Sequence, residues 1–214
     1  MDCKLLLDAA QKLLEVWMIK KVCPQSTAPA LAIALAVALL CPMAVAAQTV
    51  TGQARAVQAT AVGTIVLADT GTLGSTTDAR DATLLTGLVP SLLTGEVLHA
   101  VTVGWPDQVA SEASLADLNL AIGAIGITAD VVMASALAPL NGPVAARSFV
   151  DNLFINGIYV NVTGLPNQTV LIPGGRVIIN EQIASPSGTT VNALHATVAG
   201  VADVVIASAT AGIR

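Results

Sequence analysis

The sequence predicts an all-β protein, an antiparallel β-sandwich that is jelly-roll-like and is preceded by a helical signal peptide. First, β-branched and apolar runs recur along the chain, and Gly, Pro and Asn turn residues separate them. Second, aromatic residues make up only 2% of the chain, so a core would consist of Val, Ile, Leu and Ala, which suits closely spaced sheets. Third, the N-terminal part carries the features of an export signal.

Residues 1–47 are interpreted as a leader that contains this signal. The apolar run at 28–40 follows Lys20 and Lys21 and precedes the small residues of "AVAAQ" at 44–48. A basic stretch, a short apolar stretch and a small-residue cleavage site form a secretory signal peptide. The run is shorter than the roughly 20 residues of a membrane-spanning helix. We therefore expect a secreted or cell-surface protein with no stable membrane span after cleavage.

The start and the end of the leader leave alternatives open. Residues 1–17 form an amphipathic helix pattern, which is either a gene-start artefact before translation from Met18 or part of a long leader. Cleavage after Ala47 or after Ala46 fits the small-residue rule. Lipidation at Cys41 is disfavoured because Leu40 stands where a lipobox needs a small residue.

The expected strands can be followed in order after residues 48–63, an N-terminal segment that is a possible donor strand. The segments are 60–69, 96–105, 126–138, 154–164, 169–183, 190–198 and 201–211, within a sandwich domain at 64–214. Asn156-Gly157 is a strong hairpin signal. Pro173-Gly174 supplies the fixed φ and the positive φ of a tight turn between two apolar runs.

Two further segments have an ambiguous pattern. Residues 81–95 could hold a helical turn. Residues 110–123 are rich in Ala, Leu and Glu and favour a helix by propensity. For the second segment we expect a strand over most of its length, on the resemblance described below.

The charge of residues 48–214 limits the possible partners. This part holds five arginines, no lysine and eleven acidic residues. An acidic, lysine-free surface repels phosphates and anionic lipid headgroups, so we expect no nucleic-acid partner. All three cysteines (Cys3, Cys23 and Cys41) lie in the leader, which predicts neither disulfides nor thiol chemistry in the domain.

Polar residues inside predicted strands are the candidate site residues, and we interpret them as structural. They are Asn180, Glu181, Gln182, Asn192, His195, Asp203, His99 and Asp130. Strand alternation places Leu194, Ala196 and Val198 on one face, and Val191, Ala193, His195 and Thr197 on the other.

His195 has two readings. It could act as a general base or metal ligand with Asp203 or Glu181, or it could be a hydrogen-bonded structural histidine, which we favour because convergent ligands are few. His99 is read in the same way, with Glu96 expected on the opposite strand face. "NEQ" at 180–182 could form a buried network or bind a cation, and a structural network is favoured.

No motif of an enzyme or of a cofactor site is found. The sequence lacks Gly-x-Ser-x-Gly, Ser-x-x-Lys and phosphate-loop patterns. The acidic stretch 69–81 is expected to be a solvated loop rather than a calcium site, because Leu73 and Arg80 occupy ligand positions. We therefore expect no catalytic residues, no cofactor and no metal, and predict that the protein is not an enzyme.

The second half of the sequence resembles a known family. "DNLFINGIYVNVTGLPNQTVLIPGGRVIINEQI" and "TVNALHATVAGVADVVIASATAG" are similar to the choice-of-anchor P family of secreted bacterial proteins. The most specific pieces are residues 180–182, residues 192–195 and Asp203. The resemblance implies an exported β-rich domain without known catalytic activity. After "SATAGIR" no sorting signal follows, so we expect the protein to be free or held by non-covalent assembly.

These observations lead to two functional hypotheses. The first is a secreted structural protein that self-associates into an extracellular filament or surface matrix, with residues 48–63 adding a strand to a neighbouring subunit. The alternative is a monomeric adhesin-like binding module. That reading has only Trp105 and Tyr159 on which a sugar could stack.

Overall fold

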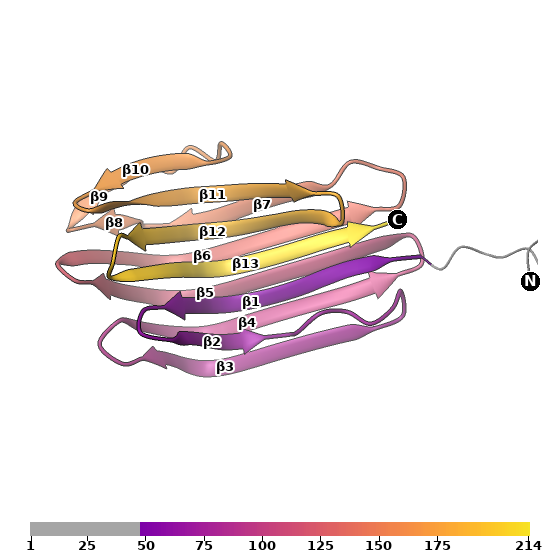
Figure 1. The fold of residues 1–214 in the computed structure, drawn as a ribbon, viewed down its shortest axis with the longest axis horizontal. Helices are drawn as coiled ribbons and strands as arrows, with labels where there is room; N and C mark the ends of the chain where they lie inside the picture. Colours follow the sequence, from indigo (N-terminus) through magenta and orange to yellow (C-terminus); the bar gives the residue numbers. More distant parts are fainter. Residues whose placement is uncertain (1–47) are drawn as a thin grey trace, which may run out of the picture. The chain divides into compact units, whose positions relative to one another are not determined.

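The computed structural model describes residues 48–214, and these residues form two antiparallel sheets packed face to face (Figure 1). Sheet A contains, in spatial order, β10 (Gln168–Ile172), β11 (Gly175–Ser185), β12 (Gly188–Val198), β13 (Ala202–Ile213), β1 (Val50–Thr60) and β2 (Thr64–Asp69). Sheet B contains β3 (Ala79–Val89), β4 (Leu93–Trp105), β5 (Gln108–Ile122), β6 (Ile125–Pro139), β8 (Phe154–Ile155) and β9 (Ile158–Tyr159), while β7 (Ala145–Asp151) also pairs with β6. The predicted β-sandwich is confirmed. The expected signal peptide lies outside the described residues.

The strand order is that of two meanders. In both sheets neighbouring strands are mostly consecutive in sequence. β8 pairs with β6 rather than with β7, and the junction of β13 with β1 joins strands from the two ends of the described chain. Jelly rolls are built from Greek keys, so the comparison with a jelly roll does not extend to these connections. The junction brings the two ends of the described chain together, because the backbones of Thr49 and Arg214 exchange hydrogen bonds of 2.8 and 3.1 Å.

Small side chains of sheet A pack against large ones of sheet B. The central strands β13 and β1 lie over β4, β5 and β6. Fully buried alanines line β1 and β13, namely Ala54, Ala56, Ala207, Ala209 and Ala211, and they face a layer that includes Leu98, Leu115, Leu120, Ile122 and Ile127. Each such Leu or Ile contributes roughly 1.5–3 kcal/mol on burial, which makes this layer the main stabilising element.

The turn predictions are confirmed, and neither of the two ambiguous segments is helical. Asn156 and Gly157 have φ of 50° and 73° and join β8 to β9, as the hairpin signal requires. Gly174, with φ of 74°, follows Pro173 between β10 and β11. The possible helical turn at 81–95 is a β3–β4 hairpin, and residues 110–123 lie in β5, as preferred, apart from the turn residue at the end.

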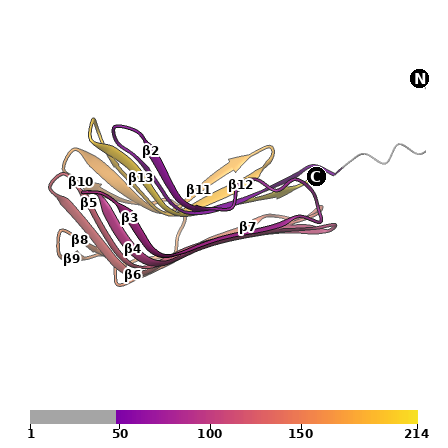
Figure 2. The same cartoon turned by 90° about the horizontal axis from the view of Figure 1, so that it is seen from below.

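The long strands bend midway, along a line that crosses both sheets (Figure 2). Positive φ angles mark this line at Ala68, Asn180 and Ala207 in sheet A, and at Val97, Asp117 and Asn152 in sheet B. At each position the inside–outside alternation shifts by one residue. In β5, for example, Leu115 and Leu118 are buried, while Ala116 and Asp117 both point outward.

The bend affects the two sheets in opposite ways. At the bend, two consecutive residues of a strand point to the same side. In sheet A both point inward, as Ile206 and Ala207 do, and in sheet B both point outward, as Glu96 and Val97 do. The outer face of sheet A is therefore the inner side of the bend, where outward side chains three residues apart converge. Arg55 and Gln58 of β1 show this convergence, because they are hydrogen-bonded to each other.

Candidate functional site

A cluster of polar side chains lies on the outer face of sheet A at the bend. We call it the His195 cluster: Glu181 from β11, Asn192, His195 and Thr197 from β12, and Asp203 from β13. Strand register places Glu181 beside Asn192 and Thr197 beside Asp203. His195 lies between these two pairs, on the opposite side of the bend from Glu181.

Both ring nitrogens of His195 contact carboxylates. Nδ1 lies 2.8 Å from Oε2 of Glu181, and Nε2 lies 3.0 Å from Oδ2 of Asp203. Asn192 Nδ2 donates to the same Glu181 oxygen at 2.6 Å, and Thr197 Oγ1 donates to Asp203 Oδ2 at 3.1 Å. Each carboxylate thus has two partners, and the cluster joins three strands.

The cluster satisfies its own hydrogen-bonding groups. Each ring nitrogen of His195 lies within hydrogen-bonding distance of a carboxylate, and an imidazole N–H donates to such an oxygen. The His195 side chain is 19% exposed, which leaves the interaction partly shielded from water. Thr197, His195 and Glu181 together supply a hydroxyl, an imidazole and a carboxylate, the three groups of a catalytic triad. However, His195 Nε2 lies 3.0 Å from Asp203 Oδ2 and 3.4 Å from the Thr197 hydroxyl, so its nearer partner is the carboxylate. The geometry therefore favours a structural clamp over an activated nucleophile.

The other candidate residues belong to different environments. Asn180, with φ of 53°, is buried and donates from Nδ2 to the Gly164 carbonyl at 3.0 Å. Gln182 Nε2 donates to the Ala146 carbonyl at 2.9 Å and so links the two sheets. The "NEQ" stretch is thus divided between faces, because Glu181 points outward and its two neighbours make contacts on the other side.

The two candidates in sheet B lie on the opposite sheet from the His195 cluster. His99 lies on the outer face between Thr83 and Ser114. Asp130 accepts a hydrogen bond of 2.6 Å from Asn152 Nδ2 at the bend of sheet B. The sequence gives no direct sign that His99 and His195 lie in different layers, because both follow the same local pattern.

Two predictions about strand faces are wrong. Val191 and Ala193 are buried with Leu194, and His195 and Thr197 alone of that set point outward, because the alternation shifts between Ala193 and Leu194. Glu96 was expected opposite His99. The shift at Val97 places both on the outer face.

Of the acidic stretch 69–81, residues 70–78 form a loop, whereas Asp69 ends β2 and residues 79–81 begin β3. The protein itself engages the Asp78 carboxylate of this loop. Asp78 Oδ2 accepts from the Gly74 N–H and from Arg80 Nε, both at 2.8 Å. The hydrogen bond from Gly74, and then that from Arg80, lower the pKa of Asp78 below its ordinary value. Among residues 48–214 no group of three His, Cys, Asp or Glu side chains is arranged to hold a metal ion.

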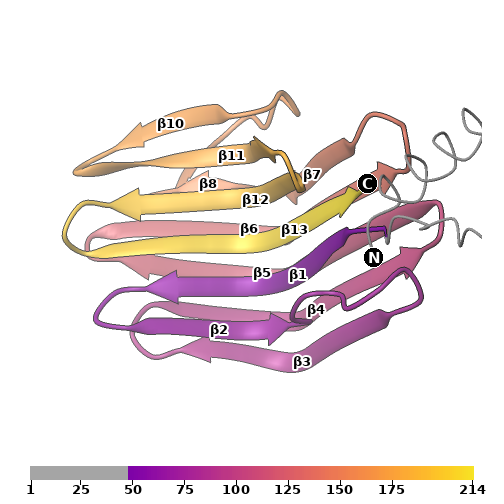
Figure 3. The ribbon, with the colours of Figure 1, turned by 45° about the vertical axis from the view of Figure 1, so that its right-hand side comes forward.

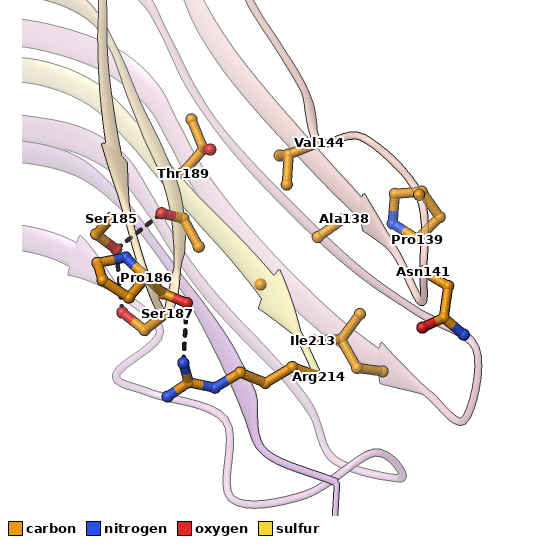
Figure 4. Close-up of a pocket in the computed structure, with 13 residues that line it drawn as sticks. Ala138, Pro139, Asn141, Val144, Ser185, Pro186, Ser187, Thr189, Ile213 and Arg214 are labelled. Carbon is orange, nitrogen blue, oxygen red and sulfur yellow. Dashed lines mark hydrogen bonds between the residues drawn. The ribbon is translucent and has the colours of Figure 1, made fainter.

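A small hollow of about 330 Å³ lies at the end of the sandwich where the described chain terminates (Figure 4). The β6–β7 turn, the β11–β12 turn and the last residues of β13 line it. Arg214 is the charged side chain of this lining, and its Nη1 donates to the Pro186 carbonyl at 3.0 Å. Turn backbone and small side chains form most of the wall, so the hollow offers little specific chemistry.

Comparisons with known proteins add no identification: no protein-family model, no curated protein and no solved structure matches this chain. The resemblance to the choice-of-anchor P family therefore stays a prediction from the quoted motifs. In the part of the chain that the structure describes, no helix has the length and apolar character needed to cross a membrane.

Proposed function

We propose that this chain is an exported structural protein whose copies self-associate into a filament or surface matrix by exchanging strand β1. The observation that carries the proposal is the position of β1. It is the first strand of the described chain, yet it lies inside sheet A, between β13 and β2 (Figure 3).

The sandwich depends on having a strand in this position. β1 pairs with β13 from Val50–Ile213 to Thr60–Asp203, and with β2 from Arg55–Asp69 to Thr60–Thr64. Its inward side chains are at the centre of the core. Without β1, the facing backbone groups of β13 and β2 would lose their partners, which is costly for buried N–H and C=O groups.

The same contacts can be made by the β1 of another copy, because the sequence is identical. Residues 61–63 connect β1 to β2 in a short turn, with Val62 fully exposed and open space around Gly63. An extended conformation at this turn would carry β1 away from its own sheet. Exchange through such a hinge gives closed dimers when it is reciprocal and open filaments when it runs head to tail.

A cysteine pair across β1 and β13 tests the proposal. Gln58 and Val205 are direct partners, and the full chain would carry Q58C/V205C with the three leader cysteines replaced by serine. In the assembled protein we expect disulfides between chains, seen as a ladder in a non-reducing denaturing gel. A disulfide within one chain, in material that forms filaments, would contradict strand exchange.

The matched control is a second pair that exchange of β1 leaves intact. T190C/T210C joins β12 to β13, and these strands are next to each other in sequence as well as in space. This variant is expected to form disulfides only within one chain. A ladder in the control would show that the gel reports non-specific cross-linking rather than strand exchange.

One observation favours the alternative of a binding module. Trp105 lines a hollow of about 740 Å³ together with Glu112, Arg147 and Gln182, which combines an aromatic surface with polar groups. Tyr159 instead packs edge-on against Phe154, with ring centroids 5.6 Å apart. Size-exclusion chromatography separates the two functions: a monomer at high concentration supports binding, and a large assembly supports the structural role.

A further inference from the structure

The outer face of sheet B carries a group of exposed apolar side chains on the β7 side of the bend. On sheet B the outward residues include Val101 and Val103 of β4, Val131, Met133 and Leu137 of β6, and Phe149 of β7. Leu137 is 40% and Phe149 51% exposed. Large exposed apolar patches on a soluble domain mark interaction surfaces.

The strand register shows how these side chains are arranged. Leu137 lies between Ala110 of β5 and Ala145 of β7, and Met133 lies between Ser114 and Phe149. Large side chains therefore recur along β6, interrupted by Ser135, with smaller residues on either side of Leu137. Because its neighbours are small, the exposed Leu137 side chain can contact an opposing surface.

The charges on this face are self-complementary. Glu112, Ser135 and Arg147 form one row across β5, β6 and β7, so an acid and a base flank β6. Arg147 Nε donates to Ser135 Oγ at 3.2 Å, and the ion pairs of the described residues include neither Arg147 nor Glu112. A two-fold axis along β6 would place Glu112 of each copy opposite Arg147 of the other.

We propose that this face, on the β7 side of the bend, binds the same face of a second copy. The axis along β6 then packs Leu137 and Met133 on their own counterparts and forms two intermolecular Glu112–Arg147 ion pairs. In an isologous contact the same patch of both copies forms the interface. An acid on one side of the axis therefore meets a base only if that base lies on the other side of the axis in the same chain. The contact uses neither β1 nor sheet A, so it does not rest on strand exchange.

The test separates this contact from strand exchange by using a chain in which a disulfide holds β1 in its own sheet. The intrachain-disulfide monomer of the full-length Q58C/V205C protein, purified after refolding at low concentration, is analysed by sedimentation velocity. We expect a concentration-dependent dimer. L137E should weaken it by at least about tenfold, as the loss of a central apolar contact does. I183E, at an exposed position on the outer face of sheet A, should change the dissociation constant by less than about twofold.

The charge pair gives a second, independent readout. E112R and R147E should each weaken the dimer, because like charges then face each other, and E112R/R147E should restore it to near the original strength. Circular dichroism shows which variants are folded. A locked protein that stays monomeric at all concentrations, equal effects of L137E and I183E, or no recovery in the charge-swapped double variant would overturn the proposal.

Discussion

The two outer faces of the sandwich differ in chemistry although the same kind of strand forms both. On sheet A, most outward side chains of the central strands are polar, and those of the His195 cluster are hydrogen-bonded to one another. On sheet B, outward positions carry Val101, Met133, Leu137 and Phe149. The bend explains the polar contacts of sheet A, where outward side chains converge. The apolar patch of sheet B lies beside the bend, on its β7 side.

The largest effect is expected at the bend of sheet A. Ala207 is fully buried with φ of 51°, so A207V adds volume to the core and a β-branched side chain to a left-handed backbone. Overpacking and backbone strain together should lower the free energy of unfolding by about 3 kcal/mol or more. Urea denaturation measures this. A207G is the matched variant and should be at least as stable as the original, and a stable A207V would contradict the inward-pointing bend.

The two histidines provide the next comparison between the faces. H195A removes the imidazole that lies between the carboxylates of Glu181 and Asp203 and should lower the free energy of unfolding by about 1–3 kcal/mol. H99A, on sheet B, has no such partners among the described residues and should change it by less than about 0.5 kcal/mol. Both are measured by urea denaturation at neutral pH. Equal losses for the two variants would show that the His195 cluster does not clamp sheet A.

The bend of sheet B should respond in the opposite direction. Val97 is 57% exposed and has φ of 48°, which is a strained conformation for a β-branched residue. V97G relieves this strain without leaving a cavity and should raise the free energy of unfolding by about 1 kcal/mol. Thermal denaturation is a suitable measurement. A clear loss of stability would mean that the Val97 side chain makes contacts that outweigh its backbone strain.

The smallest effect concerns the loop that leads into sheet B. Because the pKa of Asp78 is lowered in the folded protein, its ionised form stabilises the fold above the ordinary value of 3.8. This contribution disappears as the pH falls through the lower, folded pKa. D78N should therefore be slightly less stable than the original at neutral pH, and this difference should disappear as the pH falls below the folded pKa, which makes the acid side of its stability profile flatter. Unfolding curves between neutral and acid pH measure this, and an unchanged acid limb would contradict the assignment.

The sequence predicted much of the fold and only part of the candidate site. Turn residues such as Asn156-Gly157 and Pro173-Gly174 have local conformational requirements, so they located two hairpins. The alternation of period two located the strands but could not show where it shifts by one residue. A shift of this kind put Leu115 and Leu118 at a helix-like spacing, and another buried Ala193, which we expected on the same face as His195.

The partners of His195 were named from the sequence, but their arrangement was not. Glu181 is 14 residues away, and its contact depends on the β11–β12 register together with the bend. Thr197 was placed on the correct face without being identified as a partner of Asp203. The apolar outer face of sheet B was not recognised, because an outward position can be assigned only after the shift in each strand is known.

The most direct measurement of strand exchange divides the cysteine pair between two chains. One chain carries only Q58C and the other only V205C, each without the leader cysteines, and the two are mixed before assembly. If copies exchange β1, a disulfide forms between the two kinds of chain and appears as a covalent heterodimer in a non-reducing gel. Assembled filaments that yield no such heterodimer would contradict the proposal, because every β1 would then lie in its own sheet.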